Sequence, residues 1–244
     1  MNVPAETTIA ALREAFAQWG QPARIRVDNG HPWGSWSDLP RDLALWVIGL
    51  GVAVCWNHPR RPEENGVVER ANGVTEGWVE PGRCADARQL RDRLVWAVQI
   101  QRAAYPAIGG RSRLEAYPQL LTPQRPYRPE DEAGLWDERR VYEFLAGQVW
   151  RRRADQVGQI WLYNRGYMTV PQCKGRDVTV RFDPQTREWV ILDVRGQEVR
   201  RHPAVQLTRE RIIALNVTHH RVRKSEGNGV QLGGGSEGLQ PYGG

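Results

Sequence analysis

The 244-residue sequence predicts an α/β domain followed by a small all-β barrel. The first observation is an alternation of helical and extended patterns in the first part of the chain, which is typical of an α/β domain. The second is a series of short apolar runs separated by turn residues after Trp150, which is typical of a small barrel. The third is a stretch rich in Pro and charge at residues 121–130, which separates the two regions as an interdomain linker would.

The first part of the chain predicts the order helix, strand, helix, strand, helix. Thr7 or Thr8 is a suitable cap for the first helix, and Gly20 is a typical residue to end it. The strands should be short and buried, the second of them on both faces, because their apolar runs are almost continuous. The expected elements are a helix at 7–19, a strand at 24–28, a one-sided apolar helix at 39–49, a strand at 51–56 and a helix from about Asn65.

Two carboxylates stand out because of where they fall in this pattern. Asp28 ends the first strand, and Glu69 lies about one turn into the last helix, where the partial positive charge of the N-terminus favours an acid. Asn65-Gly66 before it predicts a tight turn. A strand-end Asp and a helix-start Glu can share a divalent metal ion. Each also has an ordinary interpretation, Asp28 as a turn acid and Glu69 as a helix-start acid.

The segment Val27-Asp28-Asn29-Gly30 and the segment from Pro62 to Arg70 together resemble two motifs of the DDE integrases and transposases, D-N-G and P-x-x-N-G-x-V-E-R. The similarity is to insertion-sequence transposases with a retrovirus-type integrase core. It implies an RNase H-like core in which Asp28 matches the second carboxylate of the family and Glu69 the third. It also implies DNA integration by strand transfer, a phosphoryl transfer that uses two Mg²⁺ or Mn²⁺ ions.

Two features depart from the family pattern. By count, 40 residues lie between Asp28 and Glu69, more than the family usually has, and the loop 30–38 has room for the surplus. The first Asp of the family has no counterpart, since Glu6 and Glu14 are the only acids before Asp28 and both fall in a helical pattern. We therefore expect a partial core that lacks its first three strands, and a chain that is inactive alone.

The second half of the chain predicts a barrel of the SH3-like type, which resembles the C-terminal barrel of the same transposases. Its expected strands are 159–163, 166–170, 178–182, 189–192 and 198–200. A long helix at 85–105, a closing segment at 111–121 and a short helix at 137–146 precede it. The resulting division is a partial catalytic core at 1–118, a linker at 119–145, a DNA-binding barrel at 146–207, and a short helix with a disordered Gly-rich tail at 208–244.

Charge is unevenly distributed along the chain. Residues 1–149 hold 18 Arg against 19 acids, a net of −1, whereas residues 150–224 hold 16 Lys and Arg against 7 acids, a net of +9. The basic half favours DNA as a partner, although a solvated basic surface has the same composition. Because side chains alternate along a strand, three consecutive Arg residues cannot all face one ligand. The candidate DNA contacts are Arg60, Arg61, Asn65, Arg70, Arg151, Arg152 and Arg153; Asn65 has the alternative role of shaping the turn.

The sequence also limits where the protein acts and with what. No apolar run is long enough for a membrane span and no signal-peptide pattern is present, so we expect a cytoplasmic protein without a membrane partner. Cys55, Cys84 and Cys173 are too widely spaced to predict a metal site or a disulfide framework. The resemblance implies element-end and target DNA as partners, with further copies of the chain. Two interpretations stay open: a recombinase complete only with an upstream segment, and a non-catalytic DNA-binding or regulatory remnant of a mobile element.

Overall fold

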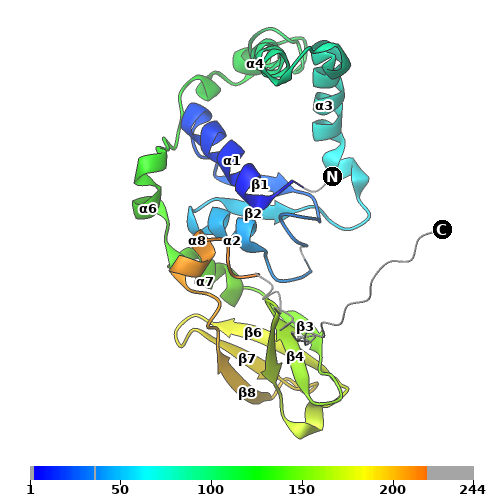
Figure 1. The fold of residues 1–244 in the computed structure, drawn as a ribbon, viewed down its shortest axis with the longest axis vertical. Coiled ribbons are helices and arrows are strands. Elements are labelled where there is room, and N and C mark those ends of the chain that lie inside the picture. Colours follow the sequence, from blue (N-terminus) through cyan, green and yellow to red (C-terminus); the bar gives the residue numbers. More distant parts are fainter. Residues whose placement is uncertain (1–2, 36, 219–244) are drawn as a thin grey trace, which may run out of the picture.

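The computed structural model describes residues 3–35 and 37–218. The molecule is elongated, with a β-rich region at one end, two helices at the other and a small α/β layer between them (Figure 1). The helices are α1 (Ala5–Trp19), α2 (Asp42–Gly49), α3 (Gly66–Val79), α4 (Ala87–Ala103), α5 (Arg113–Ala116), α6 (Glu132–Leu135), α7 (Glu138–Ala146) and α8 (Arg209–Ile213). The strands are β1 (Arg24–Val27), β2 (Ala53–Trp56), β3 (Trp150–Arg153), β4 (Gln159–Leu162), β5 (Arg165–Met168), β6 (Asp177–Asp183), β7 (Glu188–Leu192) and β8 (Glu198–Pro203).

The predicted order helix, strand, helix, strand, helix is confirmed as α1, β1, α2, β2 and α3. The strands β1 and β2 pair in parallel, with Arg24 opposite Ala53 and Val27 opposite Trp56. Helix α2 is the centre of this layer, and every one of its residues is buried. The prediction that only one side of this helix is apolar and buried was wrong, because α1, β2, α7 and α8 all pack against it.

The two-stranded sheet is less buried than its sequence predicts. In β1 only Val27 is buried, while Arg24 and Arg26 are exposed; in β2 Ala53 is exposed and Val54 is buried. The expectation of a strand buried on both faces was therefore wrong. Among the described residues this sheet consists of β1 and β2 alone, so each strand is paired along one side only.

The ends of two helices differ from the predictions. Helix α1 begins at Ala5 without a side-chain cap, and the Thr8 hydroxyl donates a hydrogen bond to the carbonyl oxygen of Pro4 at 3.2 Å. Its end at Gly20 is confirmed, with φ of 84°. The tight turn predicted at Asn65-Gly66 is absent: both residues have right-handed helical angles, because a 3₁₀ turn (Pro62–Asn65) runs directly into α3.

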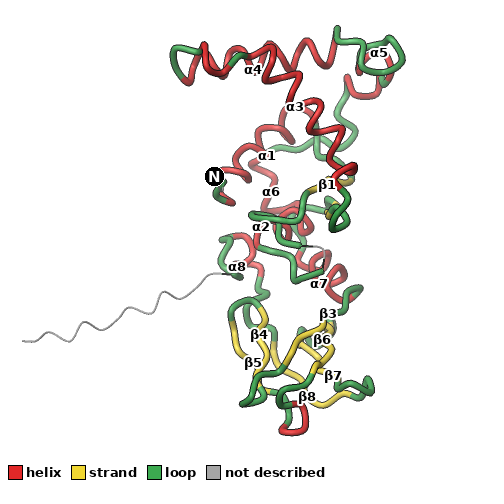
Figure 2. Tube along the Cα trace, turned by 90° about the vertical axis from the view of Figure 1, so that its right-hand side faces the viewer, coloured by secondary structure: helices red, strands yellow, loops and turns green. Residues whose placement is uncertain are grey.

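Helices α3 and α4 form an arm that extends away from the body of the molecule, with α4 crossing its end (Figure 2). Val67 and Val68, whose spacing along the sequence is helical, are 80% and 59% exposed on α3. Ala97 is the buried residue of α4. The arm is held mainly by contacts between α3, α4 and α5, so helical periodicity here does not mark a buried core face.

The stretch predicted to be a linker packs against the α/β layer. Arg125 donates hydrogen bonds to the carbonyl oxygens of Pro22, at 2.8 Å, and Gly51, at 3.0 Å. The ring of Tyr127 is buried. Helix α7, which starts one residue after the predicted Asp137, has that residue as its N-cap and contacts both α2 and β6. Arg125, Tyr127 and α7 therefore anchor this stretch to the two regions, although most of residues 121–131 are exposed.

The β-rich region contains an antiparallel four-stranded sheet in the order β3-β6-β7-β8 and a β4-β5 hairpin, which together resemble a small barrel. Its core holds the rings of Trp150, Phe182 and Trp189. The β4-β5 turn is formed by Tyr163 and Asn164, earlier than the predicted turn, because both adopt positive φ, 47° and 59°. The Gly-rich segment predicted to be disordered lies outside the described residues.

Candidate functional site

Asp28 and Glu69 lie on segments that leave the same edge of the α/β layer. Asp28 directly follows β1, and the chain leaving β2 passes through residues 57–61 into the 3₁₀ turn and α3. Parallel strands have their carboxyl ends on one edge, so the two segments start close together. Glu69 lies in the first turn of α3, as predicted, and both carboxylates are exposed.

A chain of amide hydrogen bonds links these two segments. The Asn29 side chain donates from Nδ2 to the Asn57 carbonyl oxygen at 2.5 Å, and Asn57 Nδ2 donates to Asn65 Oδ1. Asn57, at the centre of the link, is 5% exposed, whereas Asn65 is half-buried and Asn29 is exposed. It joins the residue after Asp28 to the residue four positions before Glu69. Sequence analysis missed Asn57, although a polar residue directly after a strand was a usable signal.

The loop between Asn57 and α3 is shaped by a second polar contact. The carboxylate of Glu64 accepts hydrogen bonds from the His58 backbone N–H at 2.9 Å and lies 2.8 Å from His58 Nδ1. The backbone hydrogen bond, followed by that of the ring, lowers the pKa of Glu64. Arg60 and Arg61 lie in this loop and are exposed, as is Arg70 on α3. The side chain of Asn65 accepts a hydrogen bond from Asn57, which gives Asn65 a structural role in this loop.

The acidic pair does not by itself fit two divalent ions. Each Mg²⁺ or Mn²⁺ ion needs several oxygen ligands, and two-metal centres share three or more carboxylates. Within residues 3–35 and 37–218, no three His, Cys, Asp or Glu side chains gather as a metal site would require. Asp28 and Glu69 would supply only part of the ligand set that the sequence resemblance implies.

The side chains of the three β3 arginines lie on opposite faces of the strand, as strand alternation predicts. Arg152 is directed to the α/β layer, where its guanidinium pairs with Asp38 and donates to the Arg151 carbonyl oxygen at 2.9 Å. Arg151 and Arg153 are exposed on the outward face, opposite Thr179 and Asp177 of β6. Neither forms an ion pair with a carboxylate that the structure describes. The exposed Arg181 lies further along β6 and shares this face.

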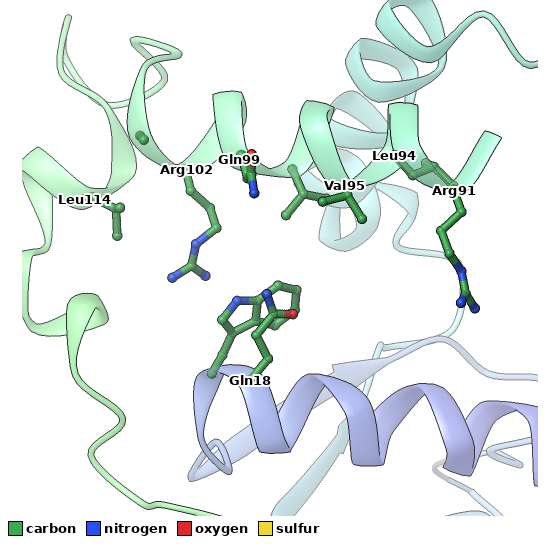
Figure 3. Close-up of a pocket in the computed structure, with 10 residues that line it drawn as sticks. Gln18, Arg91, Leu94, Val95, Gln99, Arg102 and Leu114 are labelled. Carbon is green, nitrogen blue, oxygen red and sulfur yellow. The ribbon is translucent and has the colours of Figure 1, made fainter. Parts of the chain in front are cut away.

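An apolar pocket of 330 Å³ lies elsewhere, between the end of α1 and α4 (Figure 3). Arg91, Leu94, Val95 and Arg102 extend from α4 toward it, with the Arg102 guanidinium 5.2 Å from the centroid of the Trp19 ring. Neither carboxylate of the acidic pair lines this pocket. The pocket lies between the arm formed by α3 and α4 and the body of the molecule. Neither the segment 27–30 nor the segment 62–70 lines it.

No family model matches the chain. Among solved structures, the chain is similar to one in a structure described as the cryo-EM structure of simian T-cell lymphotropic virus intasome in complex with PP2A regulatory subunit B56 gamma. The TM-score is 0.38 and the sequence identity is 16%. The match covers 83% of this chain and 63% of that one, so the chain spans less than two thirds of its length.

None of the described helices has the length and apolar character that crossing a bilayer requires.

Proposed function

We propose that this chain is a DNA-binding protein related to integrases and transposases, and that its β-rich region holds duplex DNA through the outward face of β3 and β6. The observation that carries the proposal is the exposure of Arg151, Arg153 and Arg181 on neighbouring strands. None of the three forms an ion pair with a described carboxylate, although Asp177 lies opposite Arg153. Guanidinium groups in such a position bind phosphates, which fixes the position of DNA without reading its sequence. The excess of basic residues after residue 149 supports the same partner.

Replacing Arg151 and Arg153 together by Ala is expected to weaken duplex binding and to reduce its salt dependence. If about four phosphates are neutralised, the slope of log affinity against log salt is near −3.6. The double variant should flatten that slope by about two units, one for each lost contact. Anisotropy titrations across salt concentrations measure this slope.

Arg139→Ala is the matched control, because it removes an arginine of α7 that is 80% exposed and already paired with Asp137, the N-cap of that helix. Its slope should stay that of the unmodified chain. A double variant with an unchanged slope, or binding that does not depend on salt, would refute DNA binding by this face.

The amide link between Asn29, Asn57 and Asn65 supports a second part of the proposal, that Asp28 and Glu69 belong to one site. We propose that they are two ligands of an Mg²⁺ or Mn²⁺ set that the described residues do not complete. A non-catalytic DNA-binding or regulatory protein is the alternative, and the absence of a third acidic ligand near the pair among the described residues favours it. Copies of the chain assembled on DNA remain part of the family-based proposal.

The purified chain is therefore expected to show no strand transfer on duplex DNA with magnesium or manganese. Glu69→Gln should leave duplex affinity within about twofold of the unmodified chain, because one exposed carboxylate lies outside the proposed DNA face. Gel assays of cleavage and joining, run beside anisotropy titrations, check both statements. Cleavage that is lost in Glu69→Gln would contradict the incomplete ligand set.

A further inference from the structure

The outward face of the four-stranded sheet carries a further arginine, Arg201 on β8. Arg181 of β6 is opposite Val190 of β7, and Val190 is in turn opposite Arg201. Residues directly opposite each other on paired strands have their side chains on the same face, so Arg201 shares the face of Arg181. Because neighbouring strands lie about 4.8 Å apart, the two positions are about 10 Å from each other.

Distance alone does not keep Arg201 from a duplex bound at β3 and β6. Duplex DNA carries one negative charge per about 1.7 Å of its axis, so phosphates lie within about 10 Å of any that Arg181 contacts. The side chain of Arg201 is also 37% exposed. What distinguishes Arg201 from the arginines of the proposed DNA face is therefore its immediate surroundings.

Three carboxylates surround the Arg201 guanidinium. Glu198 accepts hydrogen bonds from Nε at 2.8 Å and from Nη2 at 3.0 Å, as a bidentate partner. Asp183 accepts from Nη1 at 2.7 Å, and a Glu188 oxygen lies 3.6 Å from the same nitrogen. All three nitrogens of the guanidinium are thus engaged, and a phosphate would have to displace a charged acceptor to reach them.

The carboxylates of this cluster stay ionised at neutral pH. The hydrogen bonds from Arg201 lower the pKa of Asp183 and that of Glu198, and the same bonds raise the pKa of Arg201. With three carboxylates and one guanidinium, the cluster has a net charge of −2.

The other half of the face has the opposite charge. Arg151, Arg153 and Arg181 with the single carboxylate of Asp177 have a net charge of +2. The order β3-β6-β7-β8 places the basic group on the β3 side of the sheet and the acidic cluster toward β8 (Figure 1). A polyanion on this face is attracted to one side and repelled from the other.

We propose that Asp183, Glu188 and Glu198 limit the DNA-binding face to β3 and β6, by holding Arg201 and by repelling phosphates from β7 and β8. The inference rests on the proposed DNA binding and adds to it what restricts the extent and the affinity of that site. Arg201 is a phosphate-binding group that its own carboxylates keep from DNA.

The experiment neutralises two of these carboxylates in the full chain, with Glu188→Gln and Glu198→Gln together. Gln keeps the length of the side chain but not the charge, so phosphate becomes the stronger acceptor for Arg201. The double variant should bind a labelled blunt duplex more tightly, and its slope of log affinity against log salt should steepen by about 0.9, for one added phosphate contact. Asp183 is left in place because its Oδ1 also accepts from the N–H groups of Gln185 and Thr186.

Glu6→Gln with Glu14→Gln is the matched control. It changes the net charge by the same amount at two exposed positions of α1, outside the β-rich region. Its salt slope should stay that of the unmodified chain. Equal steepening in both double variants would assign the effect to net charge and would overturn the proposal.

Arg201→Ala in two backgrounds identifies the group that makes the new contact. Added to Glu188→Gln and Glu198→Gln, it should return the slope to that of the unmodified chain. In the unmodified chain it should leave the slope unchanged, and a slope flattened by about one unit would show that Arg201 already contacts phosphate, against the proposal. Exposed ion pairs contribute little to stability, so these variants are expected to fold.

The outcomes separate this inference from the proposed function. Duplex binding that weakens in the Arg151→Ala and Arg153→Ala variant, with no change of slope in the Glu188→Gln and Glu198→Gln variant, would overturn the limit set by the carboxylates and leave DNA binding intact. No duplex binding by either the unmodified chain or the carboxylate variant would overturn both.

Discussion

Replacing Glu132 by Gln is expected to lower the free energy of unfolding by about 3 kcal/mol. Glu132 is 9% exposed, and its carboxylate accepts two hydrogen bonds from Arg13, at 2.8 and 2.6 Å, and one from the Tyr127 hydroxyl at 2.5 Å. The indole N–H of Trp46 donates to the same carboxylate at 3.2 Å. Gln keeps the size of the side chain, but its NH₂ group cannot accept and the charge of Arg13 loses its partner. The loss lies at the lower end of the range for broken buried pairs, because the Arg13 side chain is 42% exposed.

The same variant should change how stability depends on pH. Burial alone would raise the pKa of Glu132, but the hydrogen bonds from Arg13 and Tyr127 outweigh it, so the pKa lies below its ordinary value of 4.5. A carboxylate with a lowered folded pKa stabilises above its unfolded pKa, and this contribution is lost as pH falls through the folded value. The unmodified chain should therefore lose more stability than Glu132→Gln on acidification below about pH 4.5.

Urea unfolding at a series of pH values between neutral and acidic conditions measures both effects. Glu14→Gln is the matched control, since Glu14 is an exposed carboxylate on the same helix as Arg13. Parallel pH profiles for Glu132→Gln and the unmodified chain would contradict the assignment of the lowered pKa to folding.

Glu132 also illustrates what the sequence could not predict. Its partners are 119, 86 and 5 positions away in the chain, so no local pattern brings Arg13 and Trp46 to it. The stretch around it was predicted to be a linker from its Pro and charge, which are also compatible with packed irregular structure. Composition indicates where regular elements stop, and only tertiary contacts decide whether the segment between them packs.

The elements that depend on local signals were predicted well. The order of α1, β1, α2, β2 and α3, the end of α1 at Gly20 and the position of Glu69 follow from periodicity and capping. Which faces are buried was predicted less well. Helix α2 is buried all round because four elements meet there, whereas Val67 and Val68 at the start of α3 are 80% and 59% exposed.

The candidate site residues show the same contrast between local sequence signals and tertiary contacts. Asp28, Glu69 and the β3 arginines were found from motifs and charge, which are local in sequence. Asn57 was missed because its importance comes from contacts to both Asn29 and Asn65.

The other large effect is expected at Gly49, the last residue of α2. A Cβ atom at this position would lie 2.2 Å from Cε2 and Nε1 of Trp136. Trp136 is 2% exposed and donates from Nε1 to the Trp46 carbonyl oxygen at 3.0 Å, so the ring cannot move without breaking that bond. The Gly49 carbonyl oxygen accepts from the Asp137 N–H at 2.9 Å, which limits movement of the backbone as well.

Gly49→Ala is therefore expected to destabilise the chain by about 3 kcal/mol, at the upper end of the range for overpacked cores, even though Ala is the better helix former by about 1 kcal/mol. Gly73→Ala is the control, because a Cβ there meets nothing within 4 Å and the residue lies inside α3. It should stabilise the chain by about 0.5–1 kcal/mol if the arm unfolds with the body. Urea midpoints at unchanged m-values measure both variants. Because Gly73→Ala reports helix propensity alone, the difference between the two variants isolates the steric conflict with Trp136. A Gly49→Ala midpoint at or above that of the unmodified chain would show that Gly49 and the Trp136 ring do not meet this closely.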